Sequence, residues 1–173
     1  MREQLVFTFV GNDKPGLVEQ LSTTVVGGGG NWEASHLAHM AGKFAGIVKI
    51  SVEKKAIDSL SQELTKLEAQ GFNITIERSS EVSQEAELYH RDLSILGNDR
   101  PGIVLEISKA LAARHINIGE FSSHITSAAM AGIPLFEAML DIAIPSHIAL
   151  DELNDCLDEI ADKLDLEITL ESQ

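Results

Sequence analysis

The sequence has few of the features that form disulfides, membrane spans or export signals. Its only cysteine, Cys156, cannot form an internal disulfide, which favours a reducing compartment. No apolar run is long enough to cross a bilayer. The first residues, Met-Arg-Glu-Gln-Leu-Val-Phe, enter a strand pattern directly and lack the apolar stretch of a signal peptide. We therefore predict a cytoplasmic protein.

Basic residues are also scarce. The chain has 13 Lys and Arg against 27 Asp and Glu, which gives a formal net charge of −14. A DNA-binding protein needs clustered cations, because Lys and Arg must contact several phosphates and displace their counterions. Each contact contributes about 0.9 to the magnitude of the slope of log affinity against log salt concentration. Here the few cations are scattered along the chain. This predicts no direct contact with nucleic acid, so any role in transcription would require a partner protein.

The residue patterns of common active sites and cofactor sites are absent from the sequence. It contains no Gly-x-Ser-x-Gly elbow and no His-Glu-x-x-His helix, and its six histidines lack metal-ligand spacing. The run Gly27–Gly30 follows a predicted helix rather than a strand, which argues against a phosphate loop. Because glycine disfavours helix, we expect this run to end the first helix early and to form a flexible connection. We predict a protein that is not an enzyme and holds no metal or cofactor.

One motif occurs twice. Asn-Asp-Lys-Pro-Gly-Leu-Val at Asn12–Val18 returns as Asn-Asp-Arg-Pro-Gly-Ile-Val at Asn98–Val104, 86 residues later. The apolar positions that follow keep the same register at helical spacing: Leu17, Val18, Leu21 and Val25 match Ile103, Val104, Ile107 and Leu111. The sequence therefore predicts two similar modules, residues 1–80 and 88–173, joined by the polar segment 81–87.

Each half contains the same order of apolar patterns. Leu5–Val10 indicates a buried strand, and a helix, two strands, a second helix and a last strand follow it. Right-handed crossovers then predict an α+β protein of two ferredoxin-like βαββαβ modules, each a four-stranded antiparallel sheet with two helices on one face. The offset between halves grows from 86 to 94. Matching Ser35-His36-Leu37 to Ser123-His124-Ile125 predicts two added residues, a bulge, early in the corresponding strand.

The repeated motif lies where a strand leads into a helix, a place suited to a polar ligand. We expect Pro15 in the first helical turn, Asp13 accepting hydrogen bonds from the free amides of that turn, and Gly16 allowing close approach of a ligand. The helix start could hold an amino acid's carboxylate, and Asp13 or Asn31 its ammonium group. A carboxylate there is worth typically about 0.3–1 kcal/mol. A well-capped helix that binds nothing is the alternative, and the same choice applies to the second copy.

The motif in this setting resembles that of the ACT domain, a regulatory unit that binds amino acids, generally where two modules meet. The tandem arrangement, with the segment Asn31–Phe44 after the first helix, is similar to the glycine cleavage system transcriptional repressor group. The resemblance covers the chain from about Leu5 to Leu170. The sequence departs from the pattern at Gly27–Gly30 and at Trp32, where the second copy has Ile118, which leaves open whether the two loops are equivalent.

The resemblance implies ligand contacts from both loops and from the start of the strand after the first helix in each half. These residues are Asn12, Asp13, Pro15, Gly16, Leu17 and Asn31, with Asn98, Asp99, Pro101, Gly102, Ile103 and Asn117 in the second copy. It also implies a small amino acid such as glycine as ligand and a transcription regulator as protein partner, and it allows a homo-oligomer. A regulatory adaptor for an enzyme of amino-acid metabolism is the alternative function.

Overall fold

A computed structural model describes residues 1–78, 88–127 and 133–172. The chain divides into two compact units, Met1–Val82 and Ser83–Gln173, and each is described by itself. The predicted connecting segment 81–87 lies outside the described residues.

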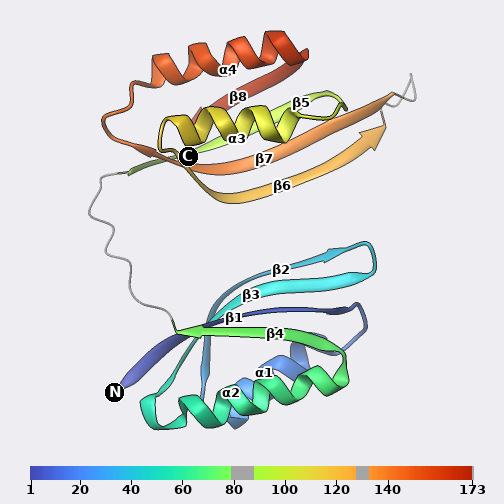
Figure 1. Ribbon diagram of the computed structural model, residues 1–173, viewed down its shortest axis with the longest axis vertical. Helices are drawn as coiled ribbons and strands as arrows, with labels where there is room; N and C mark the ends of the chain where they lie inside the picture. The colour runs from blue at the N-terminus through green and yellow to red at the C-terminus, as the bar shows by residue number, and fades with distance from the viewer. Residues whose placement is uncertain (79–87, 128–132, 173) are drawn as a thin grey trace. The chain divides into compact units, whose positions relative to one another are not determined.

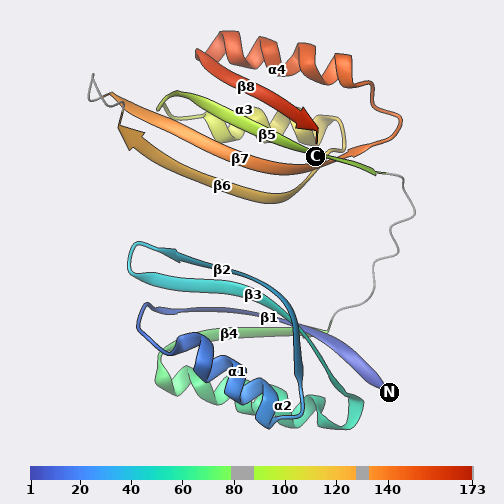
Figure 2. The same cartoon turned by 180° about the vertical axis from the view of Figure 1, so that it is seen from behind.

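The first unit forms one four-stranded sheet with two helices, which lie on one of its faces (Figures 1 and 2). The strands follow the order β2-β3-β1-β4, and every neighbouring pair is antiparallel. In chain order the elements are β1 (Arg2–Asn12), α1 (Leu17–Gly27), β2 (Asn31–Met40), β3 (Lys43–Glu53), α2 (Ile57–Lys66) and β4 (Phe72–Arg78). Short 3₁₀ turns, Lys54–Ala56 and Leu67–Gln70, flank α2.

The second unit repeats this arrangement with the strand order β6-β7-β5-β8. Its elements are β5 (Leu88–Asn98), α3 (Ile103–Ala113), β6 (Asn117–Ser127), β7 (Pro134–Pro145), α4 (Leu150–Leu164) and β8 (Leu166–Ser172). The predicted fold is therefore confirmed: both units are antiparallel βαββαβ sheets with their helices on one face.

The core of each unit lies between the sheet and its helices. In β1, Leu5, Phe7 and Phe9 are buried, whereas Val10 on the opposite face is 47% exposed. In β5, Leu96 is likewise 40% exposed. The predicted burial of Leu5–Val10 is therefore wrong for Val10, because successive side chains of a strand point to opposite faces and here only one face is covered.

The register of the sheets places most of the extra residues of the second unit in a hairpin. Met40 pairs with Lys43, whereas Thr126, 86 positions after Met40, pairs with Leu135, 92 positions after Lys43. The offset is therefore constant through β2 and β6, increases to 92 at the hairpin tip, and reaches 94 at β4 and β8, where Ile76 corresponds to Leu170. Both strands carry a register shift at the same place, after Trp32 and after Ile118. The predicted two-residue addition early in β6 is wrong, because the bulge is common to both units.

The glycine run does not shorten the first helix. Helices α1 and α3 have 11 residues each and end at equivalent positions, Gly27 and Ala113. In α1, the amide of Gly30 donates to the carbonyl of Val25 at 2.8 Å, and the chain turns at Gly29 with φ 74°. The expected early end and flexible connection are wrong: the run forms a hydrogen-bonded helix end of the Schellman type.

Two further findings concern the described residues as a set. Within them, no helix is long and apolar enough to cross a membrane. The same residues contain no group of three or more His, Cys, Asp and Glu side chains that could hold a metal ion.

Candidate ligand-binding loops

The Pro-Gly pair of each motif forms a turn before the helix. Gly16 has φ 89° and ψ 2°, and Gly102 has φ 104° and ψ −10°, which are the values of the third residue of a type II turn. Proline suits the preceding position because its φ is fixed, and glycine tolerates the positive φ. The helices therefore begin at Leu17 and Ile103, and the expectation of both prolines in the first helical turn is wrong.

The aspartates of the two motifs do not cap the helices. No side chain forms a capping hydrogen bond at the start of α1 or α3. The Asp13 carboxylate lies instead 3.5 Å from Nε2 of His39 on β2. The predicted capping role of Asp13 and Asp99 is wrong, so the first-turn amides are not satisfied by either aspartate.

The loop backbone is held by the neighbouring hairpin in both units. The amide of Asp13 donates to the carbonyl of Gly42 at 3.0 Å, and that of Asp99 to Pro134 at 2.9 Å. Because these two bonds are equivalent, the two loops share one backbone arrangement.

An open cavity of about 320 Å³ lies at the first loop. Its volume is at the lower end of the range for small-molecule sites. Its lining combines two carboxylates, one ammonium group and an apolar part: Asp13, Lys14, Gly16, Leu17, Val18, Glu19 and Phe44. Charges of both signs around one small cavity suit a ligand that itself carries both signs.

Three polar side chains near the first loop come from outside the repeated motif. Lys43 on β3 donates a hydrogen bond to Oδ1 of Asn12 at 2.5 Å. Glu19 on α1 lines the cavity, and His39 on β2 faces Asp13. The sequence alone does not identify these three side chains, because only the folded hairpin and helix bring them to the loop.

The predicted site residues differ in exposure and position. Most of the motif side chains are exposed, but Leu17 and Ile103 are buried in the two cores, so only their backbone could contact a ligand. Asn31 is also exposed but lies far from the loop. Asn31 pairs with Ser51 on β3, and Ser51 pairs in turn with Gln4 near the start of β1. Asn12 is the last residue of β1.

Asn31 and the first loop therefore lie at opposite ends of the sheet. The separation along β1 is eight residues, or about 26 Å at about 3.3 Å per residue. Asn117 has the same position in the second unit, aligned through Ala143 with His90. The expectation that each asparagine lies near the loop of its own unit is wrong. The same geometry places Gly27–Gly30 at the far end of α1 from the loop.

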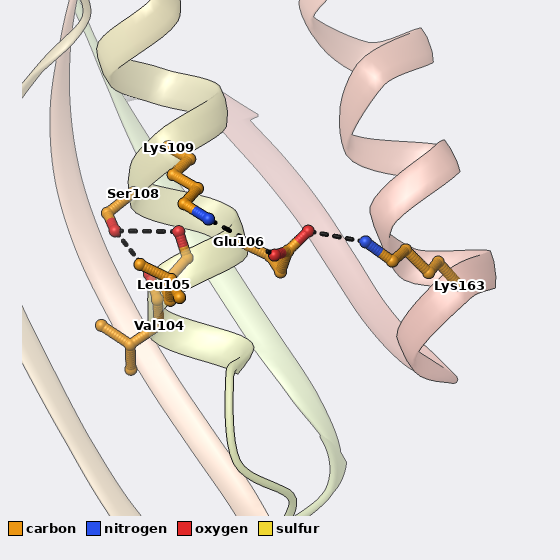
Figure 3. Close-up of polar contacts among 6 residues, drawn as sticks. All are labelled: Val104, Leu105, Glu106, Ser108, Lys109 and Lys163. Carbon is orange, nitrogen blue, oxygen red and sulfur yellow. Dashed lines mark hydrogen bonds and ion pairs between the residues drawn. The ribbon is translucent and has the colours of Figure 1, made fainter.

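The second loop has the same backbone but different neighbours. The positions of Glu19, His39 and Lys43 are occupied there by residues that carry no charge: Leu105, Ile125 and Leu135. Leu105 and Ile125 are 53% and 54% exposed. Val104 and Leu105 lie on the side of α3 away from α4 (Figure 3).

The acidic residue in the first turn of α3 is turned away from the second loop. Glu106 contacts Lys163 on α4 at 2.7 Å and Lys109 at 4.0 Å (Figure 3). The hydrogen bond and the charge of Lys163 lower the pKa of Glu106, and Lys109 adds to this. Glu106 is therefore engaged between the two helices.

Known proteins resemble the chain in both sequence and fold. Residues 3–77 match the family model described as ACT domain. An unknown protein from Galdieria sulphuraria has 27% identity and a TM-score of 0.85 over 100% of this chain and 99% of its own. A proposed glycine cleavage system transcriptional repressor has 22% identity and a TM-score of 0.72 over 98% and 96%. No curated protein matches the sequence.

Proposed function

Because the chain consists of two ACT-like modules, the first of which matches the ACT domain, we propose that it is a regulatory protein that senses a small α-amino acid. It performs no catalysis of its own in this proposal. It acts in the cytoplasm, and it influences transcription through a partner protein.

The main support for this proposal is the arrangement of groups at the first loop. Its helix start has no side-chain cap, and Asp13, Lys14 and Glu19 surround the open cavity there. The amides of the helix start and Lys14 would bind the ligand's carboxylate. The two carboxylates would bind its ammonium group.

The size of the ligand limits the affinity. Glycine has five non-hydrogen atoms, and a ceiling of about 1.5 kcal/mol per atom gives roughly 7.5 kcal/mol of binding free energy. The dissociation constant is then no tighter than a few micromolar. Such an affinity suits a metabolite that is present at micromolar to millimolar concentration.

A protein partner accounts for regulation better than direct DNA contact does. The net charge of −14 opposes binding to phosphate, and the similar fold described as a repressor suggests a role in transcription. A ligand-dependent change of about 1–3 kcal/mol in partner affinity would be typical of allosteric coupling. The second candidate, an adaptor for an enzyme of amino-acid metabolism, fits the same fold.

Titration calorimetry with glycine, serine and alanine tests the sensor proposal. We expect binding in the micromolar to millimolar range, and none for acetate or methylamine, which each carry only one of the two charges. An absence of heat and of any thermal shift at about 10 mM amino acid would contradict the proposal.

A pull-down from the source cells, with and without the amino acid that binds, tests the role of the partner. A sensor should recover a transcription regulator in amounts that depend on the ligand. Recovery of a metabolic enzyme, unchanged by the ligand, would favour the adaptor instead.

A further inference from the structure

We infer that the chain binds one ligand per molecule, at the first loop, and that the second loop lacks part of the side-chain set that recognises the ligand. The inference rests on the proposed function, since it takes an α-amino acid as the ligand. Beyond the proposed function, it identifies the copy of the repeated motif that binds the ligand. It also identifies the side chains outside the motif that determine this preference.

The backbone is not the source of the difference. Both loops have the same turn glycine at positive φ, the same helix start without a side-chain cap, and the same hydrogen bond from the aspartate amide to the hairpin. A ligand that needed only the helix amides would bind equally well to both loops. Any preference must therefore come from side chains around the loops.

At the first loop these side chains form a charged set. The Asp13 carboxylate has His39 at 3.5 Å, and the Asn12 carboxamide is held by Lys43 at 2.5 Å. Glu19 adds a second carboxylate at the cavity. Two carboxylates at the cavity can share an ammonium group, and Lys14 and Lys43 nearby offset their mutual repulsion.

At the second loop three members of that set have apolar counterparts: Glu19, His39 and Lys43 correspond to Leu105, Ile125 and Leu135. Asp99 remains, but the carboxylate of Glu106 is engaged by Lys163 on the adjacent helix. A zwitterion placed there would lose water around its ammonium group and gain contact with apolar side chains, which is unfavourable. The second loop therefore keeps the loop backbone, Asp99 and Arg100, but it lacks the second carboxylate, because Leu105 stands where the first loop has Glu19.

The test is the stoichiometry of amino-acid binding to the full chain, measured by calorimetry with glycine, serine and alanine as probes. We expect one site in the unaltered protein. Asp13→Ala should weaken binding by at least about tenfold, the size of one lost charge-assisted hydrogen bond. Asp99→Ala should change affinity by less than about twofold.

A second variant, Glu19→Leu, installs the residue of the second loop in the first. Glu19 is exposed, so the variant should fold, and we expect it to weaken binding without altering the circular dichroism spectrum. Two sites in the unaltered protein, or equal losses from Asp13→Ala and Asp99→Ala, would overturn the inference and leave the proposed function standing. A failure of the unaltered protein to bind any amino acid would overturn the proposed function and the inference together.

Discussion

The ends of α1 and α3 allow a reciprocal test of backbone strain. Gly29 and His115 occupy the same position, with φ 74° and 55°, and each amide donates to a helix carbonyl. The exposed His115 side chain holds a left-handed conformation that costs a residue with a Cβ about 1–2 kcal/mol. His115→Gly should therefore relieve strain, while the backbone hydrogen bonds remain.

The expected gain is smaller than the strain itself. Glycine increases the conformational freedom of the unfolded chain, which costs about 0.4–1 kcal/mol. We therefore expect His115→Gly to stabilise the second unit by about 0.5–1 kcal/mol. Gly29→His should destabilise the first unit by a similar amount. Among the described residues, nothing lies within 4 Å of a Cβ added at Gly29, so strain rather than a clash sets the cost.

Thermal unfolding followed by two probes separates the units. The single tryptophan, Trp32, lies in the first unit, so its fluorescence reports that unit, and circular dichroism reports both. At about 4–8 °C per kcal/mol for a domain of this size, His115→Gly should raise the dichroism midpoint by about 2–8 °C. Gly29→His should lower the fluorescence midpoint by a similar amount. A lower or unchanged midpoint for His115→Gly would refute the strain argument.

Three further predictions concern the core, an ion pair and nucleic acid. Leu60→Ala removes a fully buried side chain and should cost about 2.7–5 kcal/mol, measured by urea unfolding with Trp32 fluorescence; a cost below about 1 kcal/mol would contradict the packing described. Lys163→Met should destabilise the second unit at pH 7. The pKa of Glu106 is lower in the folded state than in the unfolded chain, so its ionised carboxylate stabilises the fold above about pH 4. The loss caused by Lys163→Met should therefore shrink as the pH falls below about 4. A loss independent of pH would contradict the assignment. Fluorescence anisotropy with duplex DNA should show no binding at low salt, whereas salt-dependent binding would contradict the charge argument.

The sequence was sufficient to predict the fold because its two periodicities repeat. Alternation along the strands and helical spacing after each Pro-Gly occur in both halves, and each half therefore supports the interpretation of the other. The buried leucines Leu60 and Leu153 lie on equivalent helices, as the repeat requires. Sequence similarity and strand register disagree in β2 and β6. Ser35-His36-Leu37 resembles Ser123-His124-Ile125, but the strand register aligns Ser35 with Phe121.

The surroundings of the loops could not be predicted in the same way. The motif is nearly identical in both halves, so it gives no sign that the two loops differ. The difference depends on residues such as His39 and Ile125, which reach the loops only through the pairing of the hairpin strands. A one-residue error in register would assign such positions to the opposite face of the sheet. The distance between Asn12 and Asn31 was missed for a related reason, because α1 carries the chain back along the sheet.

If an amino acid binds at the first loop as proposed, the hydrogen bond from the Asp13 amide to Gly42 has a kinetic consequence. A loop already fixed to a hairpin loses little conformational entropy when a ligand arrives, and no slow closing step need precede binding. With association near the diffusional limit of about 10⁸ M⁻¹s⁻¹ and a dissociation constant of roughly 10 μM, the ligand would leave at about 10³ s⁻¹. Occupancy of the first loop would then follow changes in metabolite concentration within milliseconds.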